Sequence, residues 1–476
     1  MKLLVLATTC IVPFLASAQL SAYRLADYKY RTTGFRALAF NGSSSGMYTS
    51  GTAPQKMFSL SPGLAYLQQY STDETQYHFR VLPGIAFSTS GSTSPSPMPG
   101  QEDMKQSTTN FSANVAASLL RRDFREKYFI EYGADLTLGA MGSSNRMDPN
   151  PKTTGSNLGF SLTPTIGVGR GRLEYVSDAQ MALYILKDLQ QAGKIRGEVS
   201  PATVDAFARL ITRVYNQRVF DFRRRRMFEM EKIDSFLRAS KLLTTCDITT
   251  YNIINDNWSF AIQPQAVDAV QNFSSANPLE GLNNELISDR YNIKGMFGQM
   301  ARYSGTQFYA RLRPVISDSV INSKSDTSAG KTKQSYMRYG AGLHLGVDQQ
   351  KPISLEWQVR RFASIGFDYT TFKSKSPSGF DQKYNNKGIT LTGGLGFGYY
   401  PNSRTVVQGN GSVSLVKPLG MPGAPITINP TLGFSADYFV SYFSRLNGSL
   451  NMAYANYGNG GTFNLSYNVR YIFYFF

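Results

Sequence analysis

The sequence predicts an all-β fold: an antiparallel transmembrane barrel of about 16 strands (roughly 14–18) that carries one α-helical insert. Three observations predict it. Apolar and polar residues alternate along most of the chain, and short polar turns such as 122–126 alternate with longer Ser-, Gly- and Pro-rich loops such as 141–156. The chain also ends on an alternating aromatic stretch, SYNVRYIFYFF.

Composition favours membrane strands over membrane helices. Hydrophobic residues make up 42% of the 476, yet the mean hydropathy is −0.26 and no run approaches the roughly 20 apolar residues that a membrane helix needs. Alternation along a strand keeps this average moderate. Of the two cysteines, Cys10 lies in the export signal, so Cys246 has no partner and a disulfide-stapled secreted domain is excluded.

The first 18 residues have the pattern of a secretory signal. A lysine precedes a short apolar run that ends at Ala16-Ser17-Ala18, which predicts export and cleavage near Ala18. Alternation then predicts a first barrel part of about six strands over 19–170 and a second barrel part over 251–476. Between them, 171–250 is predicted to form a periplasmic helical insert.

The alternation assigns side chains to the two faces of each strand. In TQFYARLRPVIS, Phe308, Leu312 and Ile316 share the apolar, outward face. The same reasoning gives the candidate lumen-lining residues: Arg80, Glu131, Asp135, Arg311, Arg313, Arg338, His344, Glu356, Arg360 and Asp368. Two interpretations stay open: the charges pair across the lumen and make the barrel rigid, or inward arginines form an anion-preferring passage.

Proline recurs on the apolar face of the predicted strands, at positions 62, 83, 164, 264, 314 and 430. Because proline cannot donate to a ladder, each one is expected to mark either a bulge or bend near one rim, or the end of a strand. Bends of this kind would help the sheet to curve.

From Ser177 onward the apolar spacing becomes helical. Ser177 is predicted to cap a first helix that Gly193 ends, and Ser200-Pro201 to open a single second helix. The insert is expected to pack under the barrel mouth, to plug it, or to bind a periplasmic protein through 177–245.

Charge gives a second set of candidates. The net charge is +17, but the basic residues are spread over strands and insert, and the export signal argues against a nucleic-acid partner. A basic run lies in the insert: Arg223, Arg224, Arg225 and Arg226. This run is either a solvated helix face or a contact for acidic lipid headgroups or an acidic partner.

No catalytic residue, metal site or cofactor is predicted. The two histidines, His78 and His344, lie in separate strands and are predicted to face the lumen, away from a lipid substrate. GVGRGR (167–172) lacks the Gly-Lys-Ser/Thr ending of a phosphate loop and is interpreted as a flexible junction before the insert.

The mature chain resembles the Gram-negative outer-membrane β-barrel proteins over nearly its whole length, apart from the insert. The resemblance is carried by the export signal, the alternating strands, the unequal connections and the aromatic terminus. The resemblance implies an outer-membrane location, contact with membrane lipids and lipopolysaccharide, and insertion by the barrel-assembly machinery, which recognises the last strand. Ile472, Tyr474 and Phe476 fit that assembly signal, while Asn468 and Arg470 break its apolar row.

A barrel of this size is wide enough for a water-filled lumen. The first expectation is therefore a transport or pore-type protein whose insert gates the barrel or docks a partner. The alternative is a non-conducting structural or assembly subunit of an envelope complex, with the barrel as anchor. A lipid-modifying barrel enzyme ranks third, because it would need an outward Ser-His pair.

Overall fold

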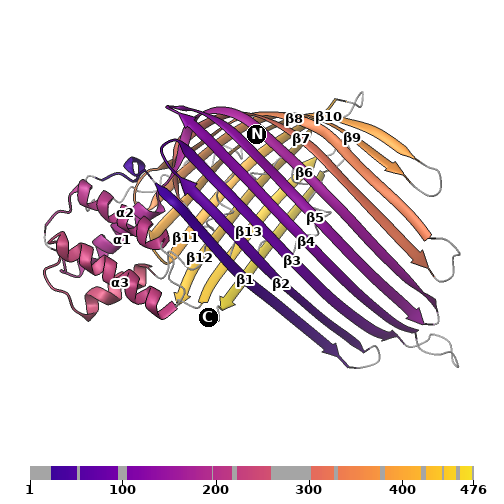
Figure 1. The fold of residues 1–476 in the computed structure, drawn as a ribbon, viewed down its shortest axis with the longest axis horizontal. Helices are drawn as coiled ribbons and strands as arrows, with labels where there is room; N and C mark the ends of the chain where they lie inside the picture. Colours follow the sequence, from indigo (N-terminus) through magenta and orange to yellow (C-terminus); the bar gives the residue numbers. More distant parts are fainter. Residues whose placement is uncertain are drawn as a thin grey trace.

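The protein is one large antiparallel sheet with helices at one end (Figure 1). The computed structural model describes residues 23–29, 31–50, 54–94, 104–148, 150–195, 197–216, 222–258, 302–325, 331–375, 381–419, 425–441, 444–456 and 461–473. The sheet curls round, so that the strands before the helices form the near wall in Figure 1 and later strands the far wall.

Fourteen strands are described, each paired with the next along the chain. Those before the helices are β1 (Thr32–Thr49), β2 (Gln55–Ser71), β3 (Thr75–Ser94), β4 (Met104–Arg125), β5 (Tyr128–Asp148) and β6 (Asn150–Tyr175). Those after them are β7 (Tyr303–Ser325), β8 (Lys331–Pro352), β9 (Trp357–Lys375), β10 (Gln382–Asn402), β11 (Thr405–Pro418), β12 (Thr427–Ser441), β13 (Ser444–Asn456) and β14 (Gly461–Phe473). The predicted antiparallel all-β fold is confirmed, with a count at the lower end of the predicted range; within the described residues no pairing joins β14 to β1.

Side chains alternate between the two faces of the sheet as predicted. In β7, Phe308, Leu312 and Ile316 are 54%, 48% and 42% exposed, whereas Arg311 is 6% exposed. Other strands repeat the pattern, with large apolar residues on the outer face. An apolar outer wall around a polar inner face is the arrangement that strands need in lipid.

Connections differ between the two ends of the sheet. At the helix end, two to four residues join the strands, at 72–74, 126–127, 353–356, 403–404 and 442–443. At the far end most connections are longer, up to the nine residues of 95–103. One predicted long loop, 141–156, is wrong. The backbones of β5 and β6 pair through it, from Met141↔Asn157 to Met147↔Asn150, and leave only residue 149 between the two strands.

The prolines interrupt ladders in the middle of strands. Pairing between β2 and β3 skips from Leu60↔Phe87 to Gly63↔Gly84, and that between β6 and β7 from Leu162↔Ile316 to Ile166↔Leu312. The first gap contains Pro62, and the second contains Pro164 and Pro314. Both predicted placements, near a rim or at strand ends, are therefore wrong for these prolines, since a missing N–H only opens the ladder locally. Pro264 lies outside the described residues.

Three named helices follow β6: α1 (Ser177–Gln191), α2 (Pro201–Asn216) and α3 (Phe222–Ala239); residues 248–258 are also helical. The prediction of a single second helix is wrong. Rings of Phe207 in α2 and Phe236 in α3 stack 5.2 Å apart, whereas one straight helix would separate them by about 44 Å. None of the described helices is long and apolar enough to cross a membrane.

Two of the three predicted helix boundaries follow the local signals. The N–H of Thr203 donates to Ser200 Oγ at 3.2 Å, and Gly193 ends α1 with a φ of +69°. The predicted cap at Ser177 is wrong. Its hydroxyl accepts the backbone N–H of Arg302 at 2.9 Å instead, because the chain returning from the insert lies beside it.

Candidate functional site at the helix end of the lumen

The inner face of the sheet is more deeply buried at the helix end than farther along. In β3, Gln76, His78 and Leu82 are buried, whereas Ala86 and Ser88 are only half-buried. His78 lies on the inner face, as predicted. The lumen is thus filled at the end that carries the helices.

An ion triad lies in this filled region. Glu131 of β5 is fully buried and accepts hydrogen bonds from Arg122 of β4 (2.7 Å) and from Arg311 of β7 (2.6 and 3.1 Å). The two arginines are 2% and 6% exposed. Removing the carboxylate would leave two buried cations without their counter-ion. The triad therefore stabilises the arrangement of three strands, β4, β5 and β7.

Other predicted lumen-lining residues also meet opposite charges. Arg360 forms an ion pair with Asp348 at 2.9 Å, and His344 Nε2 lies 3.2 Å from Asp368. Arg338 shares the inner face of β8 with His344. Both contacts join the neighbouring strands β8 and β9 along the wall rather than opposite sides of the lumen.

The remaining inward candidates occupy cross-strand rows. Arg80 of β3 and Asp135 of β5 both lie opposite Ser118 of β4. Arg313 of β7 lies opposite Gly342 of β8. These rows continue the polar inner face away from the helix end.

Glu356 does not line the lumen from a strand, so that prediction is wrong. It lies in the connection between β8 and β9, where its Oε1 is 3.4 Å from Lys187 Nζ of α1. The period-two count fails here because the strand ends at Pro352 and restarts at Trp357.

Arg302, the residue before β7, joins the insert to the rim. Its buried guanidinium donates to Gln358 Oε1 (2.9 Å) and to three backbone carbonyls around the β8–β9 connection. Val176 donates its N–H to Arg302 O (2.9 Å), beside the bond to Ser177 Oγ. Burial lowers the pKa of Arg302, and the carbonyls stabilise its charged form by accepting hydrogen bonds from it. The insert therefore leaves and re-enters the barrel at one point.

Two glycines bend β6 and β7 beside this point. Gly171 has a φ of +89° and Gly305 one of +131°. A Cβ on Gly171 would lie 2.0 Å from Thr306 O, and one on Gly305 would lie 2.1 Å from Arg172 O. Only glycine fits both positions. The flexible junction predicted for GVGRGR is wrong: the motif lies within β6 and contains this fixed bend.

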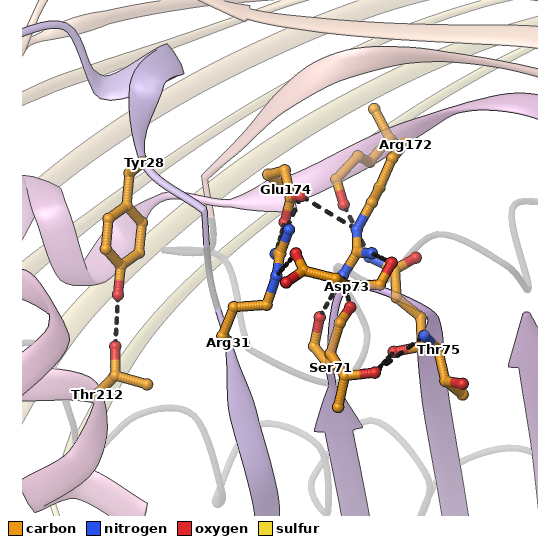
Figure 2. Close-up of polar contacts among 11 residues, drawn as sticks. Tyr28, Arg31, Ser71, Asp73, Thr75, Arg172, Glu174 and Thr212 are labelled. Atoms are coloured by element: carbon orange, nitrogen blue, oxygen red, sulfur yellow. Dashed lines mark hydrogen bonds and ion pairs between the residues drawn. The ribbon is translucent and has the colours of Figure 1, made fainter. Parts of the chain in front are cut away.

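Beyond the bend, the end of β6 crosses the barrel end. Arg172 donates to Ser71 Oγ at 2.8 Å (Figure 2). It also donates to Thr72 O (2.7 Å), and Gln76 donates to Leu173 O (3.2 Å). In the sheet, β3, β4 and β5 stand between β2 and β6. These hydrogen bonds therefore span the mouth instead of following a ladder.

A charge cluster completes the crossing (Figure 2). Arg31, just before β1, lies 2.6 Å from Asp73 and 3.0 Å from Glu174, and Arg172 lies 3.0 Å from Glu174. The hydrogen bond from Arg31 lowers the pKa of Asp73. Two cations and two carboxylates thus join the N-terminal segment, the β2–β3 turn and the end of β6.

A second link in Figure 2 runs from the N-terminal segment into the helices. The segment contains a short 3₁₀ helix, η1 (Leu25–Asp27), followed by buried Tyr28. The hydroxyls of Tyr28 and Thr212 lie 2.6 Å apart, and Thr212 donates to Asp178 Oδ2 at 2.5 Å. Burial raises the pKa of Asp178 to about 7.

Helix α1 is the part of the insert that lies against the barrel end. Ten of its 15 residues are buried, on every side, so it is enclosed by α2 and by the rim. Tyr184 donates to Tyr400 O at 2.5 Å, and Lys187 contacts Glu356. The apolar core of the helices also includes Tyr175 and Tyr303 at the strand ends.

The basic run does not act as one exposed face. Arg226 donates to Asn255 Oδ1 (2.7 Å) and lies 3.6 Å from Glu229, so it joins α3 to the helical residues 248–258. Arg224 is exposed, and the side chains of Arg223 and Arg225 lie outside the described residues. Arg226 therefore makes contacts within the insert, which neither the solvated-face nor the lipid-contact interpretation of the run predicts.

The assembly residues are described only in part. Ile472 lies in β14 opposite Arg445. Tyr474 and Phe476 fall outside the described residues.

Three residues at the helix end are absent from the sequence-based candidates: Arg122, Arg172 and Arg302. For Arg122 a signal existed, because the alternation Leu120, Arg122, Phe124 continues through the predicted turn 122–126. For the other two no local signal exists, since the groups that Arg302 binds and the β2–β3 turn that Arg172 binds lie 50 or more residues away.

Comparisons with known proteins give weak likenesses. No protein-family model matches the chain, and no curated protein does. Similar solved structures include the transport unit of the autotransporter AIDA-I from Escherichia coli (8% identity, TM-score 0.27, 100% of this chain and 97% of that one) and the Pseudomonas putida toluene transporter TodX (9%, 0.28, 93% and 88%). A bacterial polysaccharide outer membrane secretin is a third (10%, 0.27, 93% and 98%).

Proposed function

We propose that this chain is an outer-membrane β-barrel of transport or pore type, and that its helical insert closes one end of the lumen. The observation that carries the proposal is the asymmetry of the lumen. Its inner face is polar along the strands, is buried at the helix end, and is crossed there by contacts that belong to no ladder.

The outer wall supports insertion in a membrane. Large apolar side chains on the outer face of most strands are about 40–60% exposed. Contact of this apolar surface with water is unfavourable, whereas lipid chains solvate it. Tyr467 and Val469 of β14 reach 80% and 72%. The inward faces carry the charges.

The contacts at the helix end suit a gate. Tyr184, Lys187 and Arg172 each reach the rim through polar contacts, and none of these contacts is part of a strand ladder. They could therefore separate while the wall stays paired. Opening would still have to expose part of the shared apolar core, which keeps the closed state favoured.

The preference among solutes follows from the inner charges. In the strands that the structure describes, six inward arginines (80, 122, 311, 313, 338 and 360) outnumber five inward carboxylates (131, 135, 348, 368 and 437). The excess of positive charge favours anions in an open lumen.

Single-channel recording in a planar bilayer tests the proposal. The intact protein is expected to show rare or small currents, and a version lacking 177–245 to show steady, anion-preferring current. Heat-modifiable gel migration reports whether each barrel is folded. A folded deletion variant without current would contradict the transport function.

One observation favours the non-conducting envelope subunit as a second candidate. Met227 and Ile248 of the insert are 72% and 77% exposed, which leaves apolar surface for a periplasmic protein. A stable complex with such a protein, together with no current from either form, would support this function instead.

A further inference from the structure

The outer wall has a hollow of about 1040 Å³ near the helix end, over β3–β8. Its apolar side is one cross-strand row that includes Ile130, Val168, Ala310 and Leu345. Ala310 is the smallest of these side chains, so the row is recessed at its centre. The neighbouring row, closer to the short turns, is Arg125, Tyr128, Arg170 and Phe308.

The two arginines of the second row stand on either side of Tyr128. Arg125 and Arg170 are both exposed, and Arg170 lies over the Tyr128 ring at 5.8 Å. Cross-strand neighbours are about 5 Å apart, so both guanidinium groups can reach one ligand above the ring. Neither forms an ion pair with a carboxylate in the part of the chain that the structure describes.

Acidic residues in the hollow do not cancel this charge. Asp123 is bound by Arg121 at 2.9 Å, and Thr75 also donates to it. Glu74 stands at the edge, on the far side of β4 from Tyr128 and Arg170. The arginine pair therefore presents positive charge beside an apolar recess.

A second hollow on the same wall provides a contrast. It measures about 800 Å³, lies at mid-height, and is lined mainly by apolar residues such as Leu64, Ile85 and Phe160. No Lys or Arg lines it. It suits hydrocarbon chains alone, whereas the hollow near the helix end combines hydrocarbon contacts with cations.

We propose that the hollow near the helix end binds an anionic phospholipid of the helix-side leaflet. Its phosphate lies between Arg125 and Arg170, and an acyl chain runs over Val168, Ala310 and Leu345. This inference rests on the proposed membrane location. It adds a specific lipid site, which the transport function does not require.

Native mass spectrometry of the refolded protein, with phosphatidylglycerol or phosphatidylcholine added, tests the site. At least one phosphatidylglycerol is expected to stay bound where phosphatidylcholine dissociates. In R125Q/R170Q the retained fraction is expected to fall about tenfold, as for the loss of a charge-assisted contact. In K351Q/R361Q, which removes two exposed outer cations of β8 and β9 beyond the hollow, it is expected to stay unchanged.

Two further variants separate a shaped site from general attraction. A310F fills the recess and keeps the charges, and it is expected to lower phosphatidylglycerol retention; R125K/R170K is expected to keep most of it. Equal losses in the two Gln double variants, no effect of A310F, or no preference for phosphatidylglycerol would overturn the site. Failure to insert into vesicles would instead contradict the membrane location itself.

Discussion

The barrel wall and its helix end are stabilised in different ways. In the wall, each strand pairs with the next strand of the chain, and all of these pairs except β6 and β7, which flank the insert, are close in sequence. At the helix end, side chains join elements that are far apart in sequence, such as Arg31 with Glu174 and Arg302 with Gln358. The structure of the wall follows from a repeated sequence pattern, whereas the structure of the helix end depends on contacts of particular residues.

This difference means that single substitutions should damage the helix end far more than the wall. The largest effect is expected for Glu131→Gln, which leaves Arg122 and Arg311 buried without their counter-ion. The expected loss is about 3–5 kcal/mol of unfolding free energy. Urea unfolding followed by tryptophan fluorescence measures it. Glu231→Gln, an exposed carboxylate of α3, is the control and should change little.

The second largest effect is expected at the bend that contains Gly171. Gly171→Ala forces a Cβ toward Thr306 O at a positive φ, so we expect a cost of roughly 1–3 kcal/mol and a mouth that closes poorly. Gly142→Ala is the matched control, because a Cβ there meets nothing within 4 Å. Protease resistance of the insert reports the result. Equal resistance in the two variants would mean that the bend does not position the insert.

A pH effect is expected at Asp178. Its folded pKa of about 7 lies above the unfolded value of about 3.8, so the folded insert retains a proton that the unfolded chain releases. The free energy by which protonated Asp178 stabilises the folded insert is at its full value below about pH 4. It declines as pH rises and is lost above about pH 7, and the total loss is at most about 4 kcal/mol. Hydrogen exchange of α1 at pH 5 and pH 8 should show faster opening at pH 8. Asp178→Asn should remove that difference; if the difference persists, another group is responsible.

The smallest effect separates two arginines of one helix. Arg226→Gln loses its hydrogen bond to Asn255 and its contact with Glu229, and should cost about 1–2 kcal/mol. Arg224→Gln, at an exposed position, should stay within about 0.5 kcal/mol. Thermal unfolding of the two variants, side by side, compares them. A larger loss for Arg224→Gln would reverse the assignment.

Sequence reasoning reached the wall because a period of two is a local signal. It identified the outward row Phe308, Leu312 and Ile316 and the inward Glu131 and Arg311. It could not show that Arg311 and Arg122 meet on one carboxylate, since register between β4, β5 and β7 is set by pairing along the whole sheet.

The contacts at the helix end could not be predicted from local sequence patterns, for a different reason. Arg172 stays paired with Thr306 of β7 while its side chain reaches Ser71 on the far side of the mouth, next to Gly171 with its positive φ. A strand sequence does not show which of its glycines takes a positive φ. Arg302 binds a connection about 50 residues onward. The split between α2 and α3 follows from packing on a shared core, which a helical period alone does not reveal.

The central claim is that polar contacts of α1 hold the mouth closed, and charge reversal at one of them tests it most directly. Single-channel recording would compare Lys187→Glu, which repels Glu356, with Lys232→Glu, an exposed change elsewhere on the insert. We expect a clear rise in open time for Lys187→Glu and none for Lys232→Glu. Identical closed records from both folded variants would contradict the claim that these contacts govern the lumen.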